Sequence, residues 1–404
     1  MLSLPTADEY FERIDRVISV FDSENIKIIN TMKRHGPRNL QDVSRKSGVP
    51  YPTVYTRVNK LEKEGLLRTW VYPNFSRIGL SRAMVFLSTT PGREVLARDA
   101  VKIPGYWIRT TRCTGDCNGY YSLHAIPSNN RQDFEQFIDQ IVSSGLASDS
   151  RVFWLDEYTS IIPNFEYFDQ NKGTWKFNWA SWLRTLTPAQ KPKKKPLDKE
   201  NGKKNYDKSD LLILNELMQD ARKKLSEFAK LIGITLPAAK YRFDNIVRRG
   251  LVQDYVIDIL PYPPEISDLY EIRLDFRDEE TLLADEKALQ RLPFVLGYSK
   301  IRGTNAATVR VFLPRGELNN LLTLLSALVR RKVLDRFSYL VFDCMTIEDQ
   351  TFPYKSYTND KGWHYDNHEY LAGLRKLAST LDKADHTVSF TGGAAVSSSV
   401  HCFY

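Results

Sequence analysis

Hydrophobic and polar positions follow the same helical pattern in two segments of the chain that lie 185 residues apart. When Ile28 is placed on Ile213, apolar positions coincide without a gap for about forty residues. The coincident pairs include Leu40 with Leu225, Val43 with Phe228, Val49 with Ile234, Leu61 with Ile246 and Leu66 with Leu251. The chain therefore contains an internal duplication of helix-forming sequence.

In the first copy the pattern predicts three short helices, over residues 25–34, 40–46 and 51–64. Gly48 lies in the tight turn before the third helix, where the lack of a Cβ permits a left-handed conformation. Residues 66–72 are rich in β-forming side chains and suit a wing strand. The sequence thus predicts a winged helix-turn-helix head, and the second copy repeats it.

After each head the chain alternates between strand-like and helix-like stretches in the order βαββαβ. The first copy predicts strands at 82–89, 107–111, 120–126 and 152–161 and helices at 94–100 and 132–143. The second copy predicts strands at 269–276, 295–301, 307–313 and 337–344 and helices at 280–291 and 318–331. This order is typical of an α+β ferredoxin-like sandwich, in which two helices cover one face of an antiparallel sheet.

These patterns divide the chain into a duplicated two-domain unit with flanking segments. The predicted segments are an N-terminal amphipathic helix (1–22), winged helix-turn-helix 1 (23–78), ferredoxin-like domain 1 with an extension (79–186), a basic Pro/Lys linker (187–205), winged helix-turn-helix 2 (206–262), ferredoxin-like domain 2 with an extension (263–382) and a disordered tail (383–404).

Positive charge is concentrated on the two heads and on the linker between them. Residues 27–72 carry a net charge of +7, residues 187–207 carry +4 and residues 208–257 carry +3, whereas the whole chain carries +8. The rest of the chain is therefore acidic, and the basic segments are those expected of a protein that neutralises phosphates. The alternative interpretation is that these basic residues only keep the surface soluble.

Composition indicates a globular protein, with 42% hydrophobic and 12% aromatic residues. No apolar run approaches the roughly 20 residues that cross a bilayer, and the first residues lack a basic stretch typical of a secretory signal. The four cysteines do not form a disulfide framework in a chain of this length. We therefore expect a cytoplasmic protein with no membrane partner.

The run from Gly48 to Gly65, which contains Arg57-Val58-Asn59-Lys60-Leu61-Glu62-Lys63-Glu64-Gly65, resembles the recognition-helix run of the Lrp/AsnC family of archaeal and bacterial transcription regulators. The turn from Cys113 to Tyr121 is similar to that family's effector-site turn, a glycine–aspartate between two strands. The resemblance covers about residues 20–162 and 206–345. It implies a transcription regulator that binds double-stranded DNA and responds to a small molecule.

A recognition helix reads base edges with the residues that project into the major groove, while other residues fix the register on phosphates. On the first head the base-reading candidates are Tyr51, Tyr55, Thr56 and Asn59, and the phosphate-binding candidates are Arg57, Lys60 and Arg68. On the second head the equivalent candidates are Lys240, Tyr241 and Arg242. Asp244 replaces Asn59 there, so we expect the second reader to be weaker or to prefer another sequence.

The resemblance places ligand binding at Thr114, Gly115 and Asp116. The corresponding turn of the second copy keeps Gly303 but has no aspartate after it, which puts ligand binding there in doubt. Members of the family usually carry one unit per chain and dimerise. This chain carries two, so it is expected to be its own pseudo-dimer or to assemble further.

The sequence is also compatible with two other functions. The siroheme decarboxylases of archaeal haem synthesis resemble the same two-domain unit, and such an enzyme would use histidine and arginine in the sandwich cleft, for which Arg109, Arg112 and His124 are candidates. The other is a ligand-sensing scaffold without DNA binding. We expect no enzyme, because no phosphate-binding glycine loop, nucleophile elbow or paired-histidine zinc motif is present.

Metal binding has weak support in the sequence, and no cofactor is expected. Cys113 and Cys117 lack the second ligand pair of a structural zinc site, so packing is the favoured interpretation. His364 and His368 have the spacing of neighbours on one helix face, but the first copy has no equivalent histidines.

Overall fold

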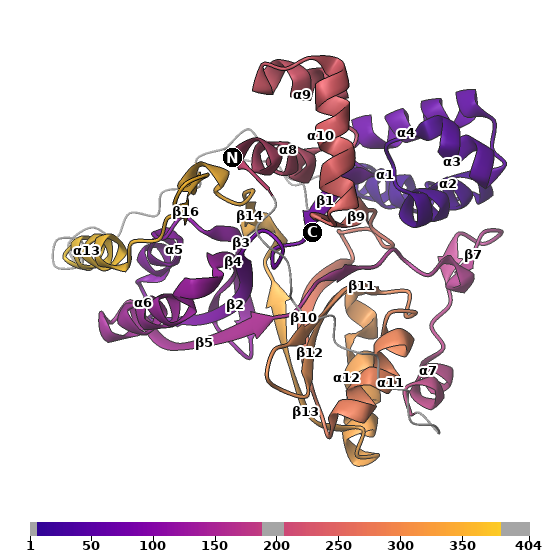
Figure 1. The fold of residues 1–404 in the computed structure, drawn as a ribbon. Coiled ribbons are helices and arrows are strands. Elements are labelled where there is room, and N and C mark those ends of the chain that lie inside the picture. The colour runs from indigo at the N-terminus through magenta and orange to yellow at the C-terminus, as the bar shows by residue number, and fades with distance from the viewer. Residues whose placement is uncertain (1–5, 188–205, 381–404) are drawn as a thin grey trace.

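The computed structural model describes residues 6–187 and 206–380, which form two heads, a closed barrel of strands and an outer layer of helices (Figure 1). The predicted tail (383–404) and, apart from Thr187, the predicted linker (187–205) lie outside the described residues. Among the described helices, none is both long and apolar enough to cross a membrane.

The first head is helical, as the spacing of apolar positions predicts. Asp22 begins the second helix by accepting a hydrogen bond from the Asn25 amide at 2.8 Å. The row of Val54, Val58 and Leu61 is buried and forms the inward face of the helix over residues 51–63. The helices are α1 (Ala7–Ile18), α2 (Ser23–His35), α3 (Leu40–Ser47) and α4 (Tyr51–Lys63).

The second head repeats this arrangement with α8 (Lys208–Gln219), α9 (Leu225–Ile232) and α10 (Leu236–Arg248). Gly48 and Gly233 end the middle helix of their heads at φ 73° and 74°, a left-handed conformation that glycine adopts without strain. The duplication seen in the sequence is therefore also a duplication of turn geometry.

Each βαββαβ unit forms the predicted four-stranded sheet with two helices on one face. The first unit contains β2 (Leu80–Thr89), α5 (Glu94–Lys102), β3 (Trp107–Gly115), β4 (Gly119–Pro127), α6 (Arg131–Ser143) and β5 (Ala147–Leu155). The second contains β10 (Ser267–Phe276), α11 (Glu279–Leu289), β11 (Val295–Ile301), β12 (Ala306–Pro314), α12 (Leu318–Arg330) and β13 (Leu334–Phe342).

The two sheets close into one eight-stranded barrel with the order β12-β10-β13-β3-β4-β2-β5-β11, in which β11 pairs back with β12. One seam joins β3 to β13 from Cys113 opposite Phe342 to Gly115 opposite Leu340, and the other joins β5 to β11 at Leu155 and Ile301. The seams pair only the ends of these outer strands, Leu155 of β5 and Leu340 to Phe342 of β13. The ring of pairings still turns toward its interior the sheet faces that the helices do not cover.

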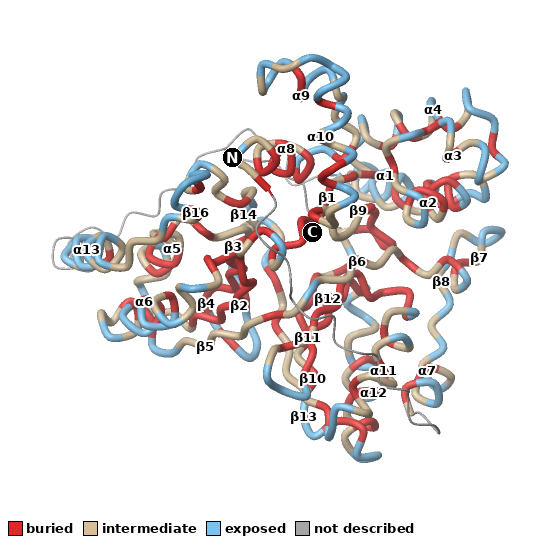
Figure 2. The backbone as a smooth tube through the Cα atoms, viewed as in Figure 1, coloured by how far each residue is buried: buried red, intermediate tan, exposed pale blue. Residues whose placement is uncertain are grey.

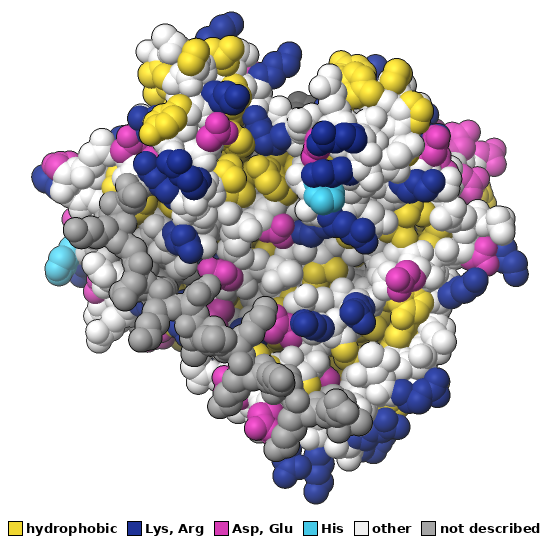
Figure 3. All heavy atoms as spheres, turned by 45° about the vertical axis from the view of Figure 1, so that its right-hand side comes forward, with side chains coloured by type: hydrophobic (Ala, Val, Ile, Leu, Met, Phe, Trp, Pro, Cys, Tyr) yellow, Lys and Arg dark blue, Asp and Glu magenta, His cyan; other side chains and the backbone are white. Residues whose placement is uncertain are grey.

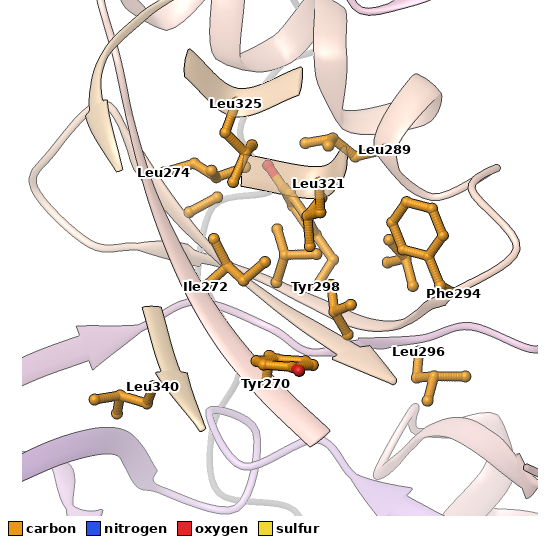
Figure 4. Packing of buried hydrophobic residues seen from close by; sticks show 14 of the residues in the cluster. Tyr270, Ile272, Leu274, Leu289, Phe294, Leu296, Tyr298, Leu321, Leu325 and Leu340 are labelled. Atoms are coloured by element: carbon orange, nitrogen blue, oxygen red, sulfur yellow. The ribbon is translucent and has the colours of Figure 1, made fainter. Parts of the chain in front are cut away.

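The helices cover the outside of the barrel, so burial follows the strands and exposure follows the outer helix faces (Figure 2). Figure 4 shows Leu274, Leu289, Leu321 and Leu325 packed around the ring of Tyr298, between the second sheet and its helices. The core of the second unit is continuous with buried residues of the first sheet, among them Phe86, Tyr121 and Leu123.

The heads attach to the barrel through a two-stranded antiparallel ribbon of β1 (Arg68–Pro73) and β9 (Val252–Asp258), which pairs Arg68 with Asp258 and Tyr72 with Asp254. Helix α8 packs on β1, and α2 packs on β9. The strand predicted as the wing of the first head therefore pairs with its counterpart from the second head.

The extensions that follow the sandwiches are exchanged between the two units. Helix α7 (Trp179–Thr185) follows the first sandwich but packs on α12, and α13 (Asn367–Ala378) follows the second but packs on α5 and α6. The shorter elements of both halves are β6 (Thr159–Ser160), β7 (Phe168–Asp169), β8 (Thr174–Trp175), β14 (Glu348–Asp349), β15 (Tyr357–Thr358), β16 (Gly362–Trp363) and 3-10 turns at Ser128–Asn130, Phe165–Tyr167, Arg315–Glu317, Cys344–Thr346 and Tyr354–Ser356.

One buried carboxyl in this fold yields a pH-dependent prediction. Asp285 on α11 is 1% exposed, and burial raises its pKa to about 7. Because this value exceeds the roughly 3.9 of an unfolded aspartate, the folded state binds the extra proton, and stability falls as pH rises from about 4 to 7. We expect Asp285→Asn to remove this loss, on the order of 2–4 kcal/mol above pH 7. Thermal unfolding at pH 5 and pH 8 measures it.

The matched control is Asp139→Asn on α6, whose side chain is exposed. We expect this control to change the melting temperature equally little at both pH values. An Asp285→Asn protein with the same pH dependence as the parent would contradict the assignment.

Candidate nucleic-acid interface

Helix α4 presents an exposed polar and aromatic face on the first head. Tyr51 and Tyr55 are 41% and 51% exposed, and their ring centroids lie 6.1 Å apart. Thr56 and Lys60 are also exposed. Four of the predicted DNA-contacting residues therefore share one accessible surface, which we call the α4 face.

Helix α10 presents the equivalent surface on the second head. Tyr241 is 67% exposed, and Lys240 beside it is exposed as well. Leu236 is 53% exposed, and Asp244 is exposed at the position of Asn59. The two surfaces thus differ in chemistry, as the sequence predicts.

Arg57 and Arg242, two of the predicted DNA-contacting residues, each form ion pairs with two carboxylates of their own head. Arg57 forms ion pairs of 2.5 Å with both Asp22 and Glu24, at the N-terminus of α2. Arg242 forms ion pairs of 2.8 and 2.6 Å with Asp207 and Asp210, at the N-terminus of α8. The hydrogen bond to Asp22 raises the pKa of Arg57.

Arg57 therefore ties α4 to α2, and Arg242 ties α10 to α8. The two carboxylates beside each guanidinium offset its positive charge. The register of the repeat preserves the interaction, which the count of charges along the sequence did not reveal.

Asn59 faces the other head instead of the exposed surface. Its side-chain oxygen accepts a hydrogen bond from Arg222 at 3.3 Å, and Arg222 also forms a 2.5 Å ion pair with Glu62. Burial raises the pKa of Glu62 against the effect of that arginine. Asn59 is thus part of a contact between α4 and the segment that joins α8 to α9.

A second contact between the heads centres on Arg38. Its guanidinium donates hydrogen bonds to the carbonyls of Ala221 and Lys223, the latter at 2.8 Å, and lies 4.4 Å from the ring centroid of Phe243. Burial lowers the pKa of Arg38. The repeat pattern does not identify Arg38, since nothing in it marks a contact between the copies.

The surface between the heads is basic. In Figure 3 the heads form two lobes, and Lys and Arg side chains gather in the notch between them. Lys33 lies at the base of the first head, where it forms a 2.6 Å ion pair with Asp254 of the ribbon. Cationic side chains are therefore concentrated in the notch between the two heads.

Arg68 and the predicted ligand turn lie away from this surface. Arg68 begins the wing strand β1, which pairs with β9 in the ribbon, and it lines the interior of the barrel. Thr114 and Gly115 pair with β13 in the barrel seam, and the Asp116 carboxylate accepts a 2.8 Å bond from Arg151. The turn is thus occupied in joining the two units.

The candidates for enzyme chemistry are not brought together. Arg109 lines the barrel interior, whereas Arg112 is exposed. His124 is fully buried beside Phe134, where burial lowers its pKa to about 3, and it does not line that interior. Its ring is therefore neutral at physiological pH.

The cysteines and histidines that the sequence offers as metal ligands lie in contacts that pack the core or cap a helix. Cys113 and Cys117 are buried, and the Cys113 thiol lies 3.7 Å from the Cys117 carbonyl oxygen. His364, Asp366 and Glu369 have ligand atoms within 4.8 Å of one another, but Asp366 accepts hydrogen bonds from the backbone at the start of α13. These contacts fit packing and helix capping.

Both heads match the winged helix-turn-helix DNA-binding family, over residues 25–68 and 206–253. The HTH-type transcriptional regulator LrpA of Pyrococcus abyssi is 33% identical over 89 residues, which are 22% of this chain and 62% of LrpA. The uncharacterized HTH-type transcriptional regulator PH1916 of Pyrococcus horikoshii is 26% identical over 95 residues, which are 22% of this chain and 63% of that protein.

The chain thus spans a little less than two thirds of the length of these relatives. The predicted resemblance to Lrp/AsnC regulators is confirmed over the shared segment. The crystal structure of the siroheme decarboxylase NirDL aligns with 89% of this chain and 100% of its own, with a TM-score of 0.49 and 12% identity.

The contact between the heads yields a prediction for Arg38. Replacing it with alanine removes two hydrogen bonds from a charged group to carbonyls and a cation–π contact, which together stabilise the chain by roughly 2–4 kcal/mol. We expect Arg38→Ala to lower the melting temperature and to speed hydrogen exchange around residues 221–223. Arg45→Ala, which removes a side chain that is 78% exposed on the same head, is the control and should have little effect. Equal exchange in both variants would contradict the docking of the heads.

Proposed function

We propose that the chain is a sequence-specific transcription regulator that binds double-stranded DNA with two readers supplied by one polypeptide. The observation that carries the proposal is that two domains of a DNA-binding family expose their recognition helices beside a basic notch. A recognition helix inserts its exposed face into the major groove, and positive charge around it attracts the phosphates.

Within this proposal the residues of the α4 face have two roles, contact with base edges and contact with a phosphate. Tyr51, Tyr55 and Thr56 contact base edges, because they are exposed and lie in the first half of the helix. Lys60 contacts a phosphate, since its side chain is 69% exposed and its ion pair with Glu64 is long, at 3.9 Å. On the second head Lys240 and Tyr241 take the corresponding positions.

Arg57, Arg242 and Asn59 serve as positioning residues in this scheme. The two arginines fix the angle of each recognition helix within its head, and Asn59 contributes to the contact between heads through Arg222. Because that contact joins the readers, they bind as a preset pair. Two half-sites about one helical turn apart would suit such a pair.

The decarboxylase reading and the scaffold reading have less support. Of the three residues that enzyme chemistry would use, only Arg109 lines the barrel interior. A scaffold without DNA binding leaves the exposed tyrosines and the basic notch without a role. We therefore propose a regulator that acts by binding and not by catalysis, with a small molecule as its effector.

The direct test is the affinity of the full chain for random and genomic duplex DNA as salt rises from about 50 to 200 mM. A steep loss of affinity with salt is expected from phosphate neutralisation, together with enrichment of sequences that carry two spaced half-sites. Weak binding that is insensitive to salt, with no enriched sequence, would overturn the proposal. A tetrapyrrole-binding assay would then test the decarboxylase reading.

A matched pair of substitutions on α4 separates phosphate contact from positioning. We expect Lys60→Gln to reduce the slope of log affinity against log salt by about one unit, since one phosphate contact is lost. Arg57→Gln should leave the slope unchanged and instead lower the stability of the head by about 0.2–1 kcal/mol, the usual range for an exposed ion pair.

Binding at several salt concentrations and thermal unfolding, performed on both variants, distinguish the two roles. A reduced slope for Arg57→Gln with unaltered unfolding would show that its pairing with Asp22 and Glu24 gives way to a phosphate.

A further inference from the structure

The interior of the barrel contains a cavity of about 350 Å³, which we call the barrel cavity. Its walls come from strands of both units, and the ribbon strand β1 and the end of helix α8 close it on the side of the heads. The volume lies within the range of small-molecule sites in proteins. The predicted ligand turn, Thr114 to Asp116, does not line it.

Charge in the barrel cavity is unbalanced. Four arginines and two carboxylates line it. Arg310 pairs with Glu271 at 2.9 Å, and Arg109 pairs with Asp349 at 2.6 Å. These two arginines are thereby neutralised within the wall, and the remaining positive charge belongs to Arg68 and Arg82.

Arg82 is the deeper of these two, with 6% of its surface exposed. It donates hydrogen bonds to the Asp156 carbonyl at 2.7 Å and to the Ser299 hydroxyl at 3.0 Å. Within residues 6–187 and 206–380, no carboxylate lies within 4.0 Å of its guanidinium. A buried charge without a counterion costs several kcal/mol, so an anion that enters the cavity gains a strong partner.

Aromatic rings surround that charge. The guanidinium of Arg82 lies 5.3 Å from the ring centroid of Tyr72 and 5.5 Å from that of Tyr158, and these two rings stack at 4.9 Å. Tyr72 is 5% exposed, and its hydroxyl has no hydrogen-bond partner among the described residues, nor has Nε of Arg82. Two buried polar atoms, the Tyr72 hydroxyl oxygen and Nε of Arg82, are thus available to a ligand beside the faces of the tyrosine rings.

We propose that the barrel cavity binds an aromatic carboxylate, whose acid group pairs with Arg82 and whose ring lies against the tyrosines. The ribbon supplies Arg68, Trp70 and Tyr72 to the cavity wall, and α8 supplies Met218 and Gln219. A ligand there contacts the strand and the helix that support the heads. Its binding therefore changes the affinity of the heads for DNA, a consequence that rests on the proposed function.

The binding test uses the full chain and the fluorescent aromatic anion 8-anilinonaphthalene-1-sulfonate. We expect one saturable site, from which 2-naphthoate displaces the dye whereas 2-naphthol and inorganic phosphate do not, because the site needs both the charge and the ring. Arg82→Met should weaken dye binding at least about tenfold, as expected for a lost charged hydrogen bond. Displacement by 2-naphthol as effective as by 2-naphthoate would overturn the proposal.

The control is Arg336→Met, which removes an arginine that is 71% exposed on strand β13 of the same barrel and should leave dye binding unchanged. If Arg82→Met does not fold, Tyr72→Phe tests the same site, since it deletes only the unpartnered hydroxyl. A roughly threefold loss of 2-naphthoate affinity is expected there. Unchanged dye binding in a folded Arg82→Met protein, or unchanged 2-naphthoate affinity in Tyr72→Phe, would overturn the site.

The effect on the heads is measured separately, as DNA affinity with and without saturating 2-naphthoate. A change in the parent protein that is absent in Arg82→Met supports the coupling. Binding of 2-naphthoate without any change in DNA affinity overturns the coupling and leaves the site intact. Absence of DNA binding in every condition overturns the proposed function, and the dye measurement still decides the site.

Discussion

The closure of two four-stranded sheets into one barrel is the constraint on which the rest of the structure depends. Helices cover one face of each sheet, and the other face must be removed from water by a partner. The short seams between β3 and β13 and between β5 and β11 let each unit cover the other. Antiparallel pairing then fixes how the two units, and the heads they carry, are oriented.

The ribbon and the extensions add further contacts in which each unit packs on the other. β1 pairs with β9, α7 packs on the helices of the second unit and α13 packs on those of the first. Each unit therefore buries part of the other, and either unit alone would expose surface that its partner covers here. The position of each head also depends on the other unit, because α8 packs on β1 and α2 packs on β9.

The sequence predicted which residues of α4 are exposed, but it did not predict which of its charged residues form ion pairs. The 3.6-residue period of α4 separates Val54 and Val58 from Tyr51 and Tyr55, and burial follows that division. Arg57 lies between these faces, so its role depends on Asp22 and Glu24, which are more than thirty residues away in the chain. Charge counting treats such a residue as free, since it records the sign of a side chain and not its partner.

The sequence by itself determined the duplication, the helices of both heads and the βαββαβ order, because these follow from local periodicity and from glycines that permit left-handed turns. Only the tertiary structure decided that the wing strands pair with each other, that the extensions are exchanged and that Arg82 and Tyr72 meet inside a barrel. Those features join residues far apart in the chain. Their physical cause is the burial of open sheet faces and strand edges, which a pattern along one segment does not specify.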